Sequence, residues 1–244
     1  MRKEPFSAGN FVHIIRRGGR GLPIVKDETD RWRFLKVHYY LNDTVSKING
    51  LRDIEDPFST KIFFWPESWP KRNPLFSLCA FTLLNNHLHI IGLETKGDGI
   101  SKFMQKSGIS MAKHFNDKYQ EKGALFQGAY HAKIIDKDEY LMWVVPYVMV
   151  KNTFEMHPKG YEWTVQNFEE AWEWAVVYPF SSLGDYGGTR NSPIVDIKPL
   201  RETLGGPKEF KRLCKDMILG REGIRERDKI VSGIASLSFE NENE

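Results

Sequence analysis

The alternation of short apolar runs with longer segments of helical spacing most restricts how this chain can fold. Apolar residues repeat every three or four positions in some segments, as on one face of a helix, whereas short runs rich in β-branched residues are typical of strands. Strands are expected at 11–15, in two halves of 75–93 and near the end of 122–135, and helices at 27–41, at 97–119 and from about 136. This order predicts an α+β fold of the ferredoxin-like split βαβ type.

We expect this sandwich to be an antiparallel sheet with helices on one face, within a domain of residues 1–195. A segment rich in proline and tryptophan at about 49–74 is expected to be an irregular insertion. Residues 196–244 are expected to be a C-terminal helical extension that ends in a frayed acidic tail.

Composition supports a packed protein but identifies no partner. Hydrophobic residues make up 41% of the chain, and the net charge of +3 permits an anionic partner without requiring one. The two cysteines are far apart and lack zinc-finger spacing, which suits a reducing compartment. The chain shows no signal peptide and no long uncharged apolar run, so we expect a cytoplasmic protein with no membrane partner.

The segment NNHLHIIGLE places two histidines one residue apart in an otherwise apolar run. Alternate side chains of a strand point to opposite faces, so His87 and His89 project from the same face. The pair is therefore a candidate metal site. The other interpretation is two structural histidines satisfied by hydrogen bonds, and the residues alone leave both open.

Several segments together resemble one family. They are FVHIIRRGGRGLPIVKDETDRWRFL, LLNNHLHIIGLE, GDGISKFMQK, HFNDKYQEKGALFQGAY, PYVMVKN and YPFSSLGDYGG. In this order they resemble the REP-associated tyrosine transposases and their insertion-sequence relatives, which have the HUH single-strand nuclease fold. The resemblance covers roughly residues 6–195, and the C-terminal region matches only loosely.

The resemblance implies a transposase-like endonuclease and strand transferase of DNA recombination. His87 and His89 fall on the HUH positions and would hold a divalent cation, Mg²⁺ or Mn²⁺, while Tyr147 falls on the nucleophile. The expected product is a 5′-phosphotyrosine and a free 3′-hydroxyl, with no nucleotide cofactor. The implied partner is single-stranded or hairpin DNA, bound by a monomer or a homodimer.

Cations are needed to follow a DNA backbone, while aromatic side chains stack on extruded bases. The candidates are Arg16, Arg17, Arg20, Lys113, Lys118, Lys122 and Lys151. The lysines of the 97–119 helix also fit an ordinary solvated face, so their role stays open.

The chain departs from the family at the third metal ligand. Relatives usually place Asn or Gln four residues after the tyrosine, but Lys151 stands there, and a protonated lysine has no lone pair for a cation. Asn152 follows, about 140° around an ideal helix from Tyr147. A π-bulge next to Pro146 would turn Asn152 towards the histidines. Otherwise Glu94, Glu155 or water would substitute, or Lys151 would contact the scissile phosphate.

Two other functions remain as alternatives. A domesticated or degenerate protein of the same fold would bind DNA without cutting it, and Ala129 is a further departure in that direction, because relatives tend to carry a basic residue there. A small-molecule metallohydrolase would need more ligands than the sequence places at recognised spacing. His13 is expected to be a structural residue of the first strand rather than a ligand.

Overall fold

A four-stranded antiparallel sheet in the order β2-β3-β1-β4 forms the centre of the computed structural model, which describes residues 6–45 and 63–220. The strands are β1 (Phe11–Arg17), β2 (Ser77–Leu83), β3 (His87–Leu93) and β4 (His131–Ile135). Because β3 lies between β1 and β2 and is antiparallel to both, the topology is the predicted split βαβ.

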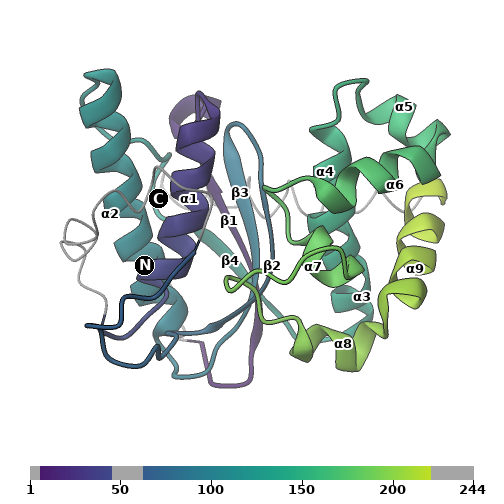
Figure 1. Ribbon diagram of the computed structural model, residues 1–244, viewed down its shortest axis with the longest axis horizontal. Helices are drawn as coiled ribbons and strands as arrows, with labels where there is room; N and C mark the ends of the chain where they lie inside the picture. The colour runs from purple at the N-terminus through teal and green to yellow at the C-terminus, as the bar shows by residue number, and fades with distance from the viewer. Residues whose placement is uncertain (1–5, 46–62, 221–244) are drawn as a thin grey trace, which may run out of the picture.

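Two helices, α1 (Glu28–Leu41) and α2 (Gly99–Tyr119), cover one face of this sheet (Figure 1). Asp27 starts α1 through a capping box, in which its carboxylate accepts the Asp30 N–H and the Asp30 carboxylate accepts the Asp27 N–H. Val12 and Ile14 of β1 are buried in the core that these helices share with the sheet. The α+β class is confirmed.

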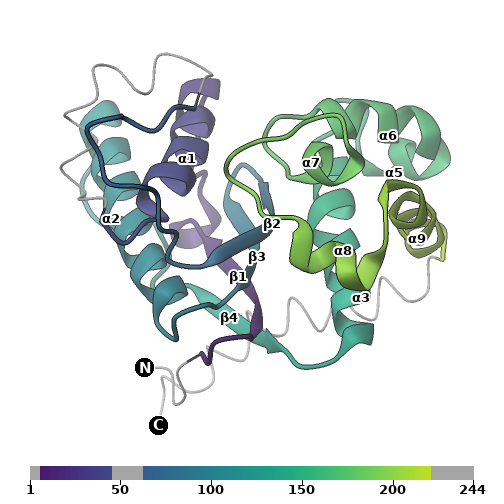
Figure 2. The same ribbon diagram turned by 60° about the horizontal axis from the view of Figure 1, so that its bottom comes forward.

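Helices also cover the opposite face, which the sequence analysis had not anticipated (Figures 1 and 2). They are α3 (Asp138–Pro146), the π-helix η3 (Tyr147–Lys151), α4 (Asn152–Glu155), α5 (Tyr161–Gln166), α6 (Phe168–Val177), α7 (Leu183–Gly187), α8 (Lys198–Leu204) and α9 (Pro207–Leu219). The reason lies in the central strands, which are apolar on both sides. Ile15 and Ile91 point into a second core with Val144 and Ala175, so this face also needs cover.

The proline-rich insertion is described only from residue 63 onward. Residues 63–74 contain neither helix nor strand, and Trp65 and Trp69 stack around Tyr40 of α1. The rest of the insertion and the acidic tail lie outside the described residues. Of the C-terminal helical extension expected at 196–244, α8 and α9 are present, up to Leu219. Within 6–45 and 63–220, no helix combines the length and apolar character needed to cross a bilayer.

The start of α2 is organised by one buried carboxylate, Glu94. Its two oxygens accept the backbone N–H groups of Thr95, Lys96, Gly97, Gly99 and Ile100. Those groups precede or open the helix, where donors lack partners within it and a negative charge is stabilised. Glu94 follows the end of β3 remote from His87, so it does not serve as the third metal ligand.

One core histidine makes stability depend on pH. Burial lowers the pKa of His38 from 6.5 to about 4, and its Nδ1 lies 2.5 Å from the Phe34 carbonyl. The unfolded chain therefore binds a proton at higher pH than the folded chain does. His38 costs no stability above pH 6.5, and stability is lost as the pH falls from 6.5 towards 4.

We expect the free energy of unfolding to fall by ~2–3 kcal/mol from this group between pH 7 and pH 4. Urea unfolding of the wild type and of His38→Asn, measured across this range, should show a smaller pH slope in the variant. Equal slopes would contradict the assignment.

Candidate active site

The pairing register of β3 sets where the histidines point. Ile15 and Thr82 flank His89 on the two neighbouring strands, and Arg17 pairs with His87. Directly paired residues of antiparallel strands share a face, and Ile15 belongs to the core beneath α3 to α9. Both histidines therefore face those helices. Their ring centroids lie 4.9 Å apart.

The Nδ1 atom of each histidine is occupied, whereas Nε2 is the nitrogen left for a ligand. His89 Nδ1 lies 3.0 Å from Nε2 of His13, and His87 Nδ1 lies 2.7 Å from Oδ1 of Asn86. With Nδ1 as the donor in each pair, both Nε2 lone pairs are free. His89 Nε2 is buried and has no hydrogen-bond partner within the described residues. An orphaned buried nitrogen of this kind fits a metal ligand.

His13 supports this arrangement from the strand beside it. It pairs with Ile91 and is therefore the diagonal neighbour of His89 across β1 and β3. Burial lowers the pKa of His13 to about 3, so its ring is neutral and can accept the proton of His89 Nδ1. From the sequence, His13 was expected to be a structural residue of the first strand. Its hydrogen bond with His89 could not be predicted, because it depends on the pairing register of β1 and β3, which are far apart in sequence.

Tyr147 lies beside the pair because α3 gives way to a π-helix at that residue. Pro146, the last residue of α3, has no N–H for the helix ladder, and a π-helical turn, one of the alternatives raised from the sequence, follows it over Tyr147–Lys151. The Tyr147 ring lies 5.9 Å from that of His89 and 5.0 Å from that of Trp143. Tyr147 is 7% exposed.

The π-helix changes which backbone N–H bonds to the Tyr147 carbonyl. Its hydrogen bonds join residues five apart, and the N–H of Asn152 donates to the carbonyl of Tyr147. Asn152 is 1% exposed, and its side-chain Nδ2 has no partner within the described residues. The two ends of an amide look alike and can exchange places, so this buried side chain can present its oxygen to a cation.

Lys151 and Glu155 form an ion pair next to the tyrosine. Lys151 Nζ lies 2.8 Å from Glu155 Oε1 and 4.9 Å from the centroid of the Tyr147 ring. Of the proposed substitutes for a third ligand, Glu155 is thus engaged by the lysine. Lys151 instead brings a positive charge to the site.

The electrostatics of the site favour neutral imidazoles and an anionic ligand. Burial lowers the pKa of His87 to about 4, with smaller contributions from Arg17 and Lys151, and burial holds the pKa of His89 well below its usual value. Neutral imidazoles keep the lone pairs that metal binding requires. The two cations that repel protonated histidine would attract a phosphate.

The structure brings Arg17 and Lys151 to the histidines but not the other candidate DNA contacts. Arg16 points to the opposite face, where it donates to the Met104 carbonyl and lies over the ring of Phe126. Arg20 is exposed in the loop after β1. Lys113 and Lys122 are exposed along and just after α2, and Lys118 is paired with Asp27 and Asp30.

The side chains around His87 and His89 would be an unusual ligand set for a metal. Within 6–45 and 63–220, no three His, Cys, Asp or Glu side chains are grouped so as to hold a metal. A site at His87 and His89 therefore needs the Asn152 amide or ligands from solvent or substrate. This arrangement lacks the acidic ligands expected of a small-molecule metallohydrolase.

Comparisons with known proteins give weak structural likeness and no match in sequence. No family model and no curated protein matches the sequence. A solved structure of a REP-associated tyrosine transposase bound to a REP hairpin is similar to 81% of this chain and 92% of its own, with 16% identity and a TM-score of 0.41. A likeness at this level transfers no activity, so function depends on the contacts described above.

Proposed function

We propose that this protein is a metal-dependent nuclease and strand transferase of single-stranded DNA, of the tyrosine transposase type. The observation that carries the proposal is the position of His89 in a pair of neutral histidines. Its Nε2 is buried and has no partner within the described residues, and its ring lies 5.9 Å from the ring of Tyr147. The candidate metal ligand His89 and the candidate nucleophile Tyr147 therefore lie side by side.

The buried Nε2 of His89, which has no partner within the described residues, fits a divalent cation, and the family resemblance implies Mg²⁺ or Mn²⁺. His87 and His89 would bind it through Nε2 and Asn152 through its side-chain oxygen, leaving positions for phosphate and water. When bound, the cation neutralises charge that develops on a phosphodiester oxygen in the transition state. Asn86 and His13 hold the two imidazoles in orientation through their Nδ1 atoms.

Tyr147 supplies the nucleophile. Its phenol oxygen forms a bond to phosphorus as the bond from phosphorus to the 3′ oxygen breaks, giving a 5′-phosphotyrosine. The phenol proton leaves to solvent, and the departing 3′ oxygen takes up a proton to become a hydroxyl. The covalent link conserves the phosphodiester bond energy, so rejoining a strand requires no nucleotide.

Positive charge near the histidines fits the DNA backbone. Arg17 and Lys151 lie close enough to depress the pKa of His87, and Arg20 is exposed in the loop that follows β1. We assign the scissile phosphate to the first two and the flanking backbone to Arg20. Lys113 and Lys122 would contact DNA only if it extends to the α2 side of the sheet.

Metal binding tests the centre directly. Mn²⁺ titration followed by electron paramagnetic resonance should show one site in the wild type, with affinity lowered at least about tenfold in His89→Ala and in Asn152→Ala. His157→Ala is the matched control, because this histidine stacks on Trp163 in another part of the fold. Equal affinity in all four proteins would refute the assigned ligands.

A second candidate function is DNA binding without cleavage. It is favoured by the low exposure of Tyr147, 7%, because a nucleophile must reach its substrate. Covalent capture separates the two. A single-stranded hairpin oligonucleotide incubated with wild type and Mn²⁺ should form an adduct that survives denaturing electrophoresis. DNA binding with no adduct would support the second candidate.

A further inference from the structure

Two carbonyls of η3 accept hydrogen bonds from side-chain hydroxyls that lie outside the helix. The carbonyl of Val148 accepts one from Thr82 Oγ1 at 2.5 Å, and the carbonyl of Met149 accepts one from Ser181 Oγ at 3.3 Å as well as one from the nearby Thr153 Oγ1 at 2.6 Å. Thr82 is on β2 and Ser181 follows α6, so the two hydroxyls come from segments distant in sequence. We name Thr82 and Ser181 the hydroxyl pair.

We propose that the hydroxyl pair positions the active site by holding η3 in its π-helical form. This inference rests on the proposed function for its significance. Neither hydroxyl needs to touch metal or DNA. Each donates to a carbonyl of the wide turn in which the backbone N–H of Asn152 bonds to the Tyr147 carbonyl.

The proposal follows from the geometry of the alternative helix. If η3 relaxed to an α-helix, the residue four positions after Tyr147 would lie over it, and Asn152 would turn to about 140° away. Single π-turns are rare and less favourable than α-helix, and they are found often at functional sites. Hydroxyl bonds to the Val148 and Met149 carbonyls therefore favour the form in which Asn152 can reach the histidines.

Thr82 is well placed for this role because it is also the cross-strand neighbour of His89. One threonine side chain thus links the strand that carries the ligand to the helix that carries the nucleophile. Its side chain is fully buried, and Thr82 Oγ1 also lies 3.4 Å from Ser181 Oγ.

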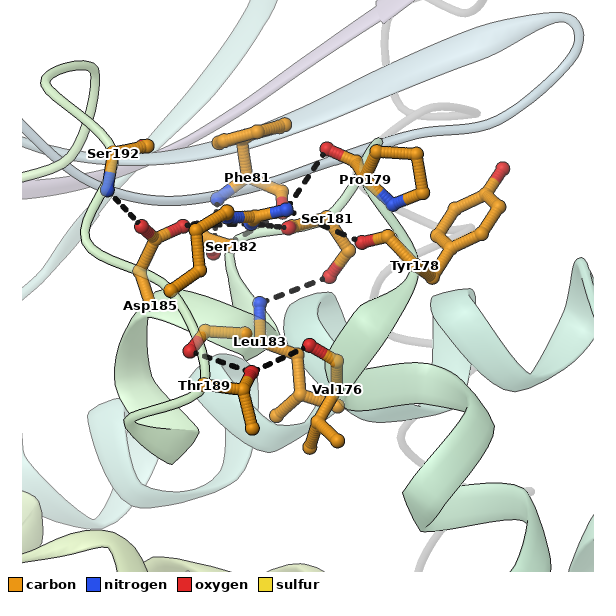
Figure 3. Close-up of polar contacts among 12 residues, drawn as sticks. Phe81, Val176, Tyr178, Pro179, Ser181, Ser182, Leu183, Asp185, Thr189 and Ser192 are labelled. Carbon is orange, nitrogen blue, oxygen red and sulfur yellow. Dashed lines mark hydrogen bonds and ion pairs between the residues drawn. The ribbon is translucent and has the colours of Figure 1, made fainter.

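Ser181 is held against β2 by a separate network (Figure 3). The backbone N–H of Ser182 donates to the Phe81 carbonyl, and Ser182 Oγ accepts the Phe81 N–H. Arg190 donates to the carbonyls of Pro179 and Ser181 and forms an ion pair with Asp185. These contacts fix the turn after α6, so Ser181 presents its hydroxyl to η3 from a rigid support.

The test compares Thr82→Val, Ser181→Ala and the double variant with two controls. Thr82→Ser keeps the hydroxyl. Thr164→Val removes a different buried threonine hydroxyl, which donates to the Tyr161 carbonyl in α5, and so reports the effect of losing such a bond elsewhere. The two readouts are Mn²⁺ affinity and the hydrogen-exchange rate of the Asn152 amide, which donates to the Tyr147 carbonyl in the π-helix and so reports how readily η3 opens.

We expect Thr82→Val to weaken Mn²⁺ binding about 10-fold to 100-fold, the usual effect of losing a group that supports metal ligands. It should also speed exchange of the Asn152 amide about tenfold or more. Thr82→Ser should restore both, and Thr164→Val should change neither. If Thr82→Val and Thr164→Val behave alike, the proposal is wrong. If the double variant does not fold, the single variants decide.

The outcome for the wild type separates this proposal from the proposed function. A wild type that binds no Mn²⁺ refutes the metal centre. The hydroxyl pair is then judged by amide exchange at Asn152 alone. Unchanged exchange in Thr82→Val and Ser181→Ala would overturn it, whereas faster exchange would support it as the determinant of the π-helix.

Discussion

Tyr147→Phe is expected to form no covalent adduct with a single-stranded hairpin oligonucleotide, while the wild type forms one in Mn²⁺. Without the phenol oxygen there is no atom on this residue to bond to phosphorus. Loss of one hydroxyl leaves the ring packed on Trp143 and His89. DNA affinity, measured by fluorescence anisotropy, should therefore change by less than about threefold.

A matched control is available about two turns earlier, on α3. Tyr140 stacks on Trp143 from the other side, 6.1 Å between ring centroids. Tyr140→Phe removes a phenol oxygen from the same aromatic row without removing the nucleophile, so the adduct should persist. An adduct in Tyr147→Phe would place the nucleophile elsewhere. No adduct from any of the three proteins, with DNA binding retained, would support the second candidate function.

Glu94→Ala is expected to lower the free energy of unfolding by about 3–5 kcal/mol. The buried carboxylate accepts five backbone N–H groups before and within the first turn of α2. Removing it leaves donors without partners, each costing roughly 1–3 kcal/mol when water cannot reach it. Water will reach some of them, which keeps the total below the sum.

Urea unfolding checks this prediction, with Glu170→Ala as the control. Glu170 is an exposed glutamate in the first turn of α6, and substitution at such a site usually changes stability by less than about 0.5 kcal/mol. A loss for Glu94→Ala no larger than for the control would mean that the α2 start forms without the carboxylate. Mn²⁺ affinity should be unchanged in the folded fraction, because Glu94 lies at the end of β3 remote from His87.

The sequence carried the order of strands and helices and therefore the split βαβ sheet. Alternation along β3 also put both histidines on one face without knowledge of the fold. The same reasoning missed the helices on the second face. Several segments after about residue 136 were recognisable as helical, but the spacing of their apolar residues does not show which face of the sheet each helix covers.

The sequence also raised a π-bulge next to Pro146 as one hypothesis, because proline removes a donor from the helix ladder. It did not predict what stabilises that turn. Thr82 and Ser181 are separated from η3 by long stretches of chain, and their hydroxyls carry no pattern that marks a partner. His13 was recognised only as a strand residue for the same reason.

The sequence alone thus determined the features that depend on neighbouring residues: the periodic faces of helices and strands, and the histidine pair on one face of a strand. Only the tertiary structure decided strand register, the contact of His13 with His89, and the burial of Tyr147. These depend on side chains far apart in sequence that meet only when β1, β2 and η3 pack together. The hydrogen bonds and the burial of side chains where these elements meet depend on all of them at once, so the sequence of one segment does not predict them.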